Sequence, residues 1–337
     1  MKKLTILGIL VLFVLVSTCV VMADDYEWQP KKPINLIVPW GAGGSTDRSA
    51  RVTADIVSDA LGVEIIVVNQ GGSSGAVGTN NALQAPKDGL TWTAGAVKDL
   101  GLYKAQGLLN TTLDDWHIYT NVAMPSVISV SVDSPYEDFG DLLQAFKDNP
   151  GKIKVATAGI NSAGGTAIAQ IKNYTGIEYN HVTYDGGNPA VVSVVSGESD
   201  VVPQLSVEQV DMINAGRLRP LAVLSDEPLK IAGYDEPVPS IKKWIPEFVS
   251  APIYFGLFVP KGVPEEVTYT LNTIWENVVM KSEKLEDWAA ENAVVYDPVY
   301  GAKAVAKSFP MIQLDAYLKY EAGDLIINPV KLGIPRP

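Results

Sequence analysis

The chain has 337 residues with a formal net charge of −12, and 47% of its residues are hydrophobic. This length predicts two domains, each with a core of its own. The acidic balance argues against nucleic acid and anionic membrane surfaces as partners. It leaves an anionic small molecule open as a ligand, because local backbone dipoles can hold an anion that the field of the whole protein disfavours.

The first 23 residues have the pattern of a signal peptide. Lys2 and Lys3 form a basic start, residues 4–16 are almost continuously apolar, and Ala23 ends a small-residue cleavage pattern. An uncleaved membrane anchor is the alternative, although the apolar run is short for a helix that crosses a bilayer. The sequence therefore predicts an exported, periplasmic protein. Its mature chain would begin at Asp24, with a net charge of about −14.

Cysteine and histidine are scarce. Cys19 is the only cysteine, and Thr18 is a poor residue to precede a lipid-modified cysteine, so we expect Cys19 to be lost with the signal peptide. A lipoprotein anchored at Cys19 is the alternative. His117, expected at the surface, and His181, expected as a partly buried strand residue, are the only histidines and lack metal-ligand spacing. We therefore expect no metal and no cofactor.

After the signal peptide, strand-like and helix-like segments alternate, which is typical of an α/β protein with mainly parallel sheets. The first expected elements are strands at 34–38, 64–68 and 90–96 and helices at 46–61 and 76–84. The pattern restarts with strands at 152–157, 179–184, 200–203 and 218–224 and helices at 166–174, 189–195 and 207–215. A proline-rich stretch at 227–252, a strand at 254–260 and helices at 264–281, 283–292 and 302–320 follow.

This order predicts two α/β lobes. The chain is expected to cross between them near 127–132 and to return near 254–259, which makes the first lobe discontinuous. We expect lobe 1 to comprise residues 24–128 and 253–337, and lobe 2 to comprise residues 129–252.

One arrangement occurs four times: a strand, a loop rich in glycine, serine or threonine, and then a helix. Ligands of open α/β sheets bind beyond the carboxyl ends of the strands. The first turn of a helix has N–H groups without intrahelical partners and a dipole that favours negative charge. Such loops can hold a carboxylate without arginine, and their only basic residue is Arg48. Ordinary helix caps and turn glycines are the alternative interpretation.

The candidate ligand-binding residues come from these loops. The hydroxyl donors are Ser45, Thr46, Ser73, Ser74, Ser162 and Thr166. The loop glycines that allow close approach to the backbone include Gly75, Gly164, Gly165, Gly186 and Gly187. Trp40 and Tyr184 are expected as cleft walls or as ordinary rim aromatics. Asp47 is most simply a helix-start residue, Asp185 is a turn residue or an acceptor that orients donors, and Gln204 follows another strand at the same sheet edge.

Two segments partly match enzyme motifs. Residues 71–75 match G-x-S-x-G, so a secreted serine hydrolase with Ser73 as nucleophile and His181 as base is an alternative function. The pattern is short in a glycine-rich chain, and hydrolases usually place several strands before this turn. Residues 41–46 form neither a complete dinucleotide motif nor a phosphate-binding P-loop. We therefore do not expect an enzyme.

Several segments resemble one known family when taken in order. They are IVPWGAGGSTD at 37–47, VN at 68–69 with GSSG at 72–75, KDGLT at 87–91, AGINS at 158–162, VTYDGG at 182–187, AGRLRPLAV at 215–223 and VPKGVP at 259–264. Their order and spacing resemble the extracytoplasmic substrate-binding subunits of tripartite tricarboxylate transporters, the Bug receptor family. The resemblance spans essentially the whole mature chain.

This resemblance implies a periplasmic-binding-protein type II-like fold, a Venus flytrap of two α/β lobes joined by a two-strand hinge. It implies binding of di- or tricarboxylates, other organic acids or amino acids for uptake by membrane transporter subunits, and we expect a monomer. The residues that it assigns to a ligand carboxylate are Gly43, Gly44, Ser45, Thr46, Gly159, Asn161 and Ser162. The second loop departs from the family pattern at Ser73 and Ser74, where the two extra hydroxyls could alter ligand preference.

Overall fold

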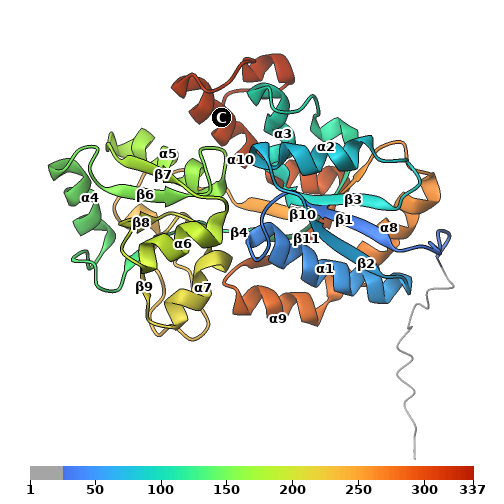
Figure 1. Cartoon of the computed structure of the whole chain (residues 1–337), viewed down its shortest axis with the longest axis horizontal. Helices are drawn as coiled ribbons and strands as arrows, with labels where there is room; N and C mark the ends of the chain where they lie inside the picture. Colours follow the sequence, from blue (N-terminus) through green and yellow to red (C-terminus); the bar gives the residue numbers. More distant parts are fainter. Residues whose placement is uncertain (1–25) are drawn as a thin grey trace, which may run out of the picture.

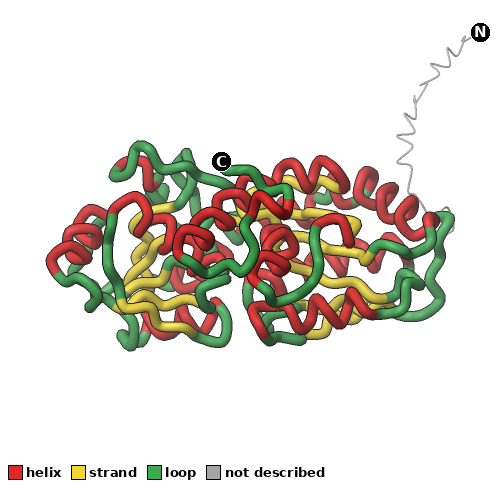
Figure 2. The backbone as a smooth tube through the Cα atoms, turned by 90° about the horizontal axis from the view of Figure 1, so that it is seen from above, coloured by secondary structure: helices red, strands yellow, loops and turns green. Residues whose placement is uncertain are grey.

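The computed structural model describes residues 26–337 and contains two β-sheets, which lie side by side along the long axis of the molecule (Figures 1 and 2). The predicted signal peptide and Cys19 lie outside the described residues. We refer to the six-stranded sheet with its helices as the first lobe, and to the five-stranded sheet with its helices as the second lobe.

The first lobe is a sheet covered on both faces. In sheet order its strands are β11 (Val295–Tyr300), β4 (Trp116–Met124), β10 (Ile253–Pro260), β3 (Thr91–Ala96), β1 (Ile34–Val38) and β2 (Ile65–Asn69). One face packs on α1 (Ser45–Leu61), α8 (Glu265–Asn277) and α9 (Glu283–Glu291), and the other on α2 (Ala76–Gln84), α3 (Val97–Gln106) and α10 (Gly301–Ala322). Each face therefore buries its own apolar core.

The second lobe repeats this three-layer design on a smaller scale. In sheet order its strands are β7 (Asn180–Thr183), β6 (Lys154–Thr157), β8 (Val201–Val202), β5 (Val127–Ser131) and β9 (Leu218–Val223). Helices α4 (Phe139–Asp148) and α5 (Ala163–Thr175) cover one face, and α6 (Gly187–Val195) and α7 (Ser206–Asn214) cover the other. Short 3₁₀ helices lie at Ser73–Gly75, Leu113–Asp115, Ile241–Lys243, Val279–Lys281 and Pro329–Leu332.

The chain passes between the lobes twice. It leaves the first sheet at the end of β4, enters the second at β5, and returns through residues 224–252 into β10. Because only residues 125–126 separate β4 from β5, the expected boundary at 128/129 falls inside β5.

The sheets are mixed, so the expectation of mainly parallel sheets was wrong. The pairs β1–β2, β1–β3, β6–β7 and β6–β8 are parallel, whereas β10 is antiparallel to both β3 and β4, β11 is antiparallel to β4, and β5 is antiparallel to β8 and β9. The antiparallel pairs involve the strands that carry the chain out of one sheet and back into it. A strand that returns the chain runs opposite to its neighbours, and this reversal leaves no mark in residue periodicity.

The predicted elements differ from the observed ones mainly at their ends. Helix α1 buries the expected face and ends where Gly62, with φ 65°, donates its N–H to Ser58. Helix α5 begins at Ala163, three residues before the expected start, because the Ser162 side chain accepts the Gly165 N–H. The elements not expected were α3, α4, β4, β5 and β11. Helix α3 lacked a helical pattern because its buried residues lie all round it.

Candidate functional site

Five helices begin around one cavity of about 50 Å³ between the lobes. Its lining includes first-turn or cap residues of α1 and α3 from the first lobe and of α5, α6 and α7 from the second. Because each helix N-terminus carries partial positive charge and unpaired N–H groups, this convergence favours an anion. Ala96, Leu205 and Phe255 add apolar wall, as is usual in small-molecule sites.

The structure brings together some of the residues predicted from the sequence. Those that line the cavity are Trp40, Gly44, Ser45, Thr46, Ser162, Gly186, Gly187 and Gln204. Those that do not line it are Gly43, Asp47, Ser73, Ser74, Gly75, Gly159, Asn161, Gly164, Gly165, Thr166, Tyr184 and Asp185. Most of the second group shape or join the loops around the cavity. Tyr184 instead directs its hydroxyl to Glu198 and Ser199, within the second lobe.

Asp47 holds the first glycine loop in place. One carboxylate oxygen accepts the Gly43 N–H at 2.8 Å, and the other accepts the Asn69 amide at 3.0 Å. Arg51 donates to both oxygens at 3.0 Å. Burial alone would raise the pKa of Asp47, but these hydrogen bonds outweigh it and lower the pKa below its usual 3.8. Asp47 is therefore a positioning residue that fixes the backbone presented to the cavity.

We expect Asp47→Asn to lower the free energy of unfolding by about 1–3 kcal/mol at pH 7. Because the pKa of Asp47 is lower in the folded state, its stabilisation is complete above the usual value and is lost as the pH falls through the folded value. The difference between wild type and variant should therefore shrink below about pH 4. Urea denaturation at several pH values measures it. Asp55→Asn, on the same helix in an exposed pair with Lys284, is the matched control and should change little.

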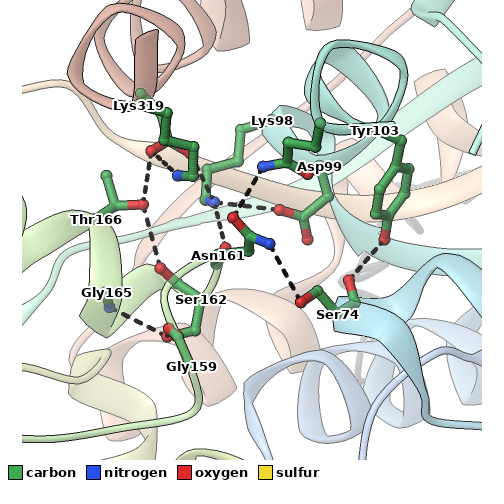
Figure 3. A network of polar contacts seen from close by, with 12 residues as sticks. Ser74, Lys98, Asp99, Tyr103, Gly159, Asn161, Ser162, Gly165, Thr166 and Lys319 are labelled. Carbon is green, nitrogen blue, oxygen red and sulfur yellow. Dashed lines mark hydrogen bonds and ion pairs between the residues drawn. The ribbon is translucent and has the colours of Figure 1, made fainter. Parts of the chain in front are cut away.

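The loop before α5 folds back on its own helix. Gly159, with φ 104°, donates its N–H to the Thr157 hydroxyl, and its carbonyl accepts from the N–H and hydroxyl of Ser162. A Cβ on Gly165 would lie 2.5 Å from the carbonyl oxygens of Gly159 and Ile160, so only glycine fits there. These contacts project the loop toward the first lobe (Figure 3).

Asn161 connects this loop to the first lobe by hydrogen bonds. Its side chain donates to the Ser74 hydroxyl at 3.4 Å and accepts from Gln106 at 3.1 Å, while its carbonyl accepts from Lys98 at 3.1 Å (Figure 3). Ser74 is also held by Tyr103, whose hydroxyl donates to the Ser74 carbonyl at 3.2 Å. The second loop therefore meets the second lobe at the rim of the cavity.

Lys98 is a buried lysine that the sequence analysis missed. Its ammonium group lies 3.0 Å from Asp315, 3.2 Å from Asp99 and 3.1 Å from the Asn161 carbonyl. Asp315 also pairs with Lys319 and accepts from the Thr166 hydroxyl of the second lobe. Burial opposes ionisation of Asp315, but the two lysines outweigh it and lower its pKa to about 2. The position of Lys98, two residues after β3 at the ligand-binding edge of the sheet, was the signal available.

Glu208 is the second missed residue. It lies in the first turn of α7 in the second lobe, and its carboxylate accepts the backbone N–H of Ser45 at the start of α1 at 3.1 Å. Burial raises the pKa of Glu208, and the hydrogen bonds from Ser45 oppose this rise. A glutamate in a helix first turn is a common stabilising feature, so sequence alone did not single it out.

Further hydrogen bonds join the lobes beside the cavity. Arg48 on α1 donates to the Val207 carbonyl at 2.7 Å and pairs with Asp211 at 3.0 Å. Asn188 on α6 donates to the Gly43 carbonyl at 2.8 Å. Polar contacts thus connect the first glycine loop and α1 of the first lobe to α6 and α7 of the second.

The hydrolase alternative gains no geometric support. Ser73 has φ 46° in the short 3₁₀ turn, but His181 lies in the second lobe, with its Nε2 2.6 Å from the Thr157 hydroxyl.

His117 is half-buried in β4 rather than exposed, and burial and Lys261 lower its pKa. Within residues 26–337, no group of three histidine, cysteine or acidic side chains could hold a metal. No helix in that range combines the length and apolar character needed to cross a bilayer.

Comparison with known proteins gives a consistent picture. Residues 49–303 match the model of the tripartite tricarboxylate transporter family receptor. The UPF0065 protein in the tcbD-tcbE intergenic region of Pseudomonas sp. (strain P51) is 32% identical over 261 residues, which is 76% of this chain and 76% of that protein.

Solved structures share the fold. One, described as a periplasmic transporter, is 28% identical with a TM-score of 0.77 and covers 87% of this chain and 97% of its own. MatC from Rhodopseudomonas palustris, solved with bound malate, is 21% identical with a TM-score of 0.71, and the match covers 88% of this chain and 99% of that one. The expected periplasmic-binding-protein type II-like fold is therefore confirmed, with mixed sheets.

Proposed function

Because this chain belongs to the tripartite tricarboxylate transporter receptor family, we propose that it captures a small organic acid in the cavity between its lobes for uptake by a membrane transporter. The family consists of solute receptors rather than enzymes, so the serine hydrolase alternative is set aside. Export to the periplasm by the signal peptide at residues 1–23, with cleavage near Ala23, belongs to the same proposal, as does a monomeric state.

The observation that carries this proposal is the convergence of five helix N-termini from two lobes on one cavity. A single N-cap and glycine loop is ordinary, but five helix starts facing the same space create a local field that suits a carboxylate. The chain as a whole has a net charge of −12, so the attraction for an anionic ligand comes from the helix N-termini at the cavity and not from the net charge of the protein. Bound malate in MatC is an instance of a carboxylate held by this fold.

The proposed mechanism is a change in the relative position of the lobes. We propose that they turn about the two connections at residues 125–126 and 224–252. An acid would dock on the first loop, around Gly44 and Thr46, and the second lobe would then close with Ser162 and Gly187. Closure would be favoured by the difference in ligand affinity between the closed and open states. The transporter would recognise the closed form.

A panel of organic acids tests this function by thermal shift. A true ligand at one hundred times its Kd should add about 2.7 kcal/mol of stability, which corresponds to a rise in Tm of roughly 5–10 °C. The panel should include di- and tricarboxylates, aromatic acids and amino acids. Ser73→Ala is the control variant and should keep the response, because Ser73 does not line the cavity. Absence of any shift across the panel would contradict the proposed function.

A further inference from the structure

A carboxylate of the protein itself already lies on two of the helix N-termini. Glu208 Oε1 accepts the Ser45 N–H at the start of α1. A Cβ on Gly187, the first residue of α6, would lie 2.3 Å from the carboxyl carbon and both oxygens of Glu208. The Glu208 side chain thus fills the space that the missing Cβ leaves. A carboxylate that is hydrogen-bonded at one helix start and packed against the first glycine of another is the arrangement expected of an acid ligand.

The second oxygen of this carboxylate has no hydrogen-bond partner among the described residues. Glu208 is 8% exposed, and its Oε2 is buried. Gln204, 1% exposed and on the same cavity wall, has a buried amide nitrogen that is likewise unpartnered. A buried polar group left unpaired costs about 1–3 kcal/mol. The cavity therefore presents one unused acceptor and one unused donor, which a ligand can satisfy together.

The charged side chains around the cavity would not neutralise a second carboxylate of a bound ligand. Lys98 has three partners for its three N–H bonds, so its ammonium group has none left to donate to a ligand. Lys98 and Lys319 with Asp99 and Asp315 form a cluster that is neutral as a whole. Glu208 adds a further carboxylate to the cavity wall. Burial raises its pKa, whereas the Ser45 N–H, the charge of Arg48 and the adjoining helix dipoles favour its ionised form.

We propose that Glu208 determines ligand specificity by occupying the position of one carboxylate, so that the cavity selects an acid with a single carboxylate and a hydrogen-bond donor. The donor would be a hydroxyl, amide or ammonium group directed at Glu208 Oε2, and the ligand's carboxylate would accept from Gln204 and the free helix N–H groups. A second carboxylate at Oε2 would meet a like charge. This inference rests on the proposed function and narrows its ligand class.

Matched acids test the selection directly. Succinate and succinamate, and glutarate and glutaramate, differ only in replacement of one carboxylate by an amide. For the wild type we expect the half-amide of each pair to bind roughly tenfold or more tightly, by calorimetry at pH 7. Glu208→Gln places a neutral N–H donor where Oε2 was, so the preference should disappear or reverse. Tighter binding of the diacid by the wild type would overturn the inference and leave the proposed function standing.

Acetate provides a second measurement that does not depend on the natural ligand. Glu208→Ala removes the internal carboxylate and opens a second carboxylate position, so acetate should raise the Tm of this variant by more than it raises the Tm of the wild type, with a rise that follows the logarithm of the acetate concentration. Asp211→Ala, also on α7 and in an exposed pair with Arg48, is the matched control and should respond to acetate as the wild type does. If Glu208→Ala does not fold, Glu208→Ser serves the same test.

The outcomes separate the inference from the proposed function. A folded Glu208→Ala variant whose Tm responds to acetate no more than that of the wild type would overturn the assignment of this position as a carboxylate site. A panel in which no acid binds would overturn both the proposed function and the ligand class. Diacid preference combined with an acetate response would overturn the ligand class alone.

Discussion

Replacing Asp315 with alanine should lower the free energy of unfolding by about 3–5 kcal/mol. The buried ammonium groups of Lys98 and Lys319 would then be balanced by a single carboxylate, that of Asp99. Asp315 contacts Lys98 at 3.0 Å, pairs with Lys319, and accepts from the Thr166 hydroxyl across the lobe interface at 3.0 Å. All four side chains are buried, so the two ammonium groups would be left poorly hydrated. The variant should also loosen the contact between α10 and α5.

Urea denaturation with a lobe-specific probe measures both effects. Lys307→Ala, in an exposed ion pair on the same helix α10, is the control and should cost no more than about 1 kcal/mol. The stabilisation by Asp315 is present above its usual pKa of 3.8 and is lost as the pH falls through about 2. The two proteins should therefore converge in strong acid. A loss equal to that of the control at pH 7 would show that the cluster does not stabilise the fold.

Replacing Gly165 with valine should displace the loop that carries Asn161 and weaken acid binding by about tenfold or more. A side chain at this position would start 2.5 Å from two backbone carbonyl oxygens, which no rotamer change can relieve. The loop would have to move away from α5, and Asn161 would lose its contacts with Ser74 and Lys98. Overpacking of this kind also costs about 1–3 kcal/mol of stability.

Gly71→Val is the matched control, because the nearest atom to its added Cβ is 4.0 Å away and its φ is not positive. Binding is measured with the acid that gives the largest thermal shift in the panel. Amide hydrogen exchange supplies a ligand-free measurement, in which residues 159–166 should exchange faster in the Gly165 variant alone. Affinity and exchange equal to those of the control would contradict the proposed role of this loop.

Several features of the fold could be predicted because their signals are local. Strands β1 and β2 are short apolar runs bounded by turn residues, and α1 repeats its apolar residues at helical spacing and ends at Gly62. Glycine before a helix start marks each loop wherever the helix later packs. The sequence alone therefore predicted four ligand-type loops and the family that they resemble.

The same local patterns do not predict which partners a side chain contacts when those partners are distant in the sequence. Asp47 is expected most simply at a helix start and also among the candidate ligand residues; it lies in the first turn of α1, and its oxygens are occupied by Gly43, Asn69 and Arg51. Tyr184 is expected as a cleft wall or as an ordinary rim aromatic, and its hydroxyl bonds to Glu198 and Ser199 in its own lobe. Both residues have the right position in the chain, and only their three-dimensional partners show what they do.

Four of the five helix starts around the cavity, those of α1, α5, α6 and α7, follow from the amino-acid sequence alone, because caps, glycines and periodicity act over a few residues. Which of those starts face one another was decided by the tertiary structure. Ser45 and Glu208 are 163 residues apart, and Lys98 and Asp315 are 217 apart. Each pair forms only when strands β4 and β10 bring the lobes and the C-terminal helix together. The charges inside the cavity follow from that long-range packing, which no local pattern encodes.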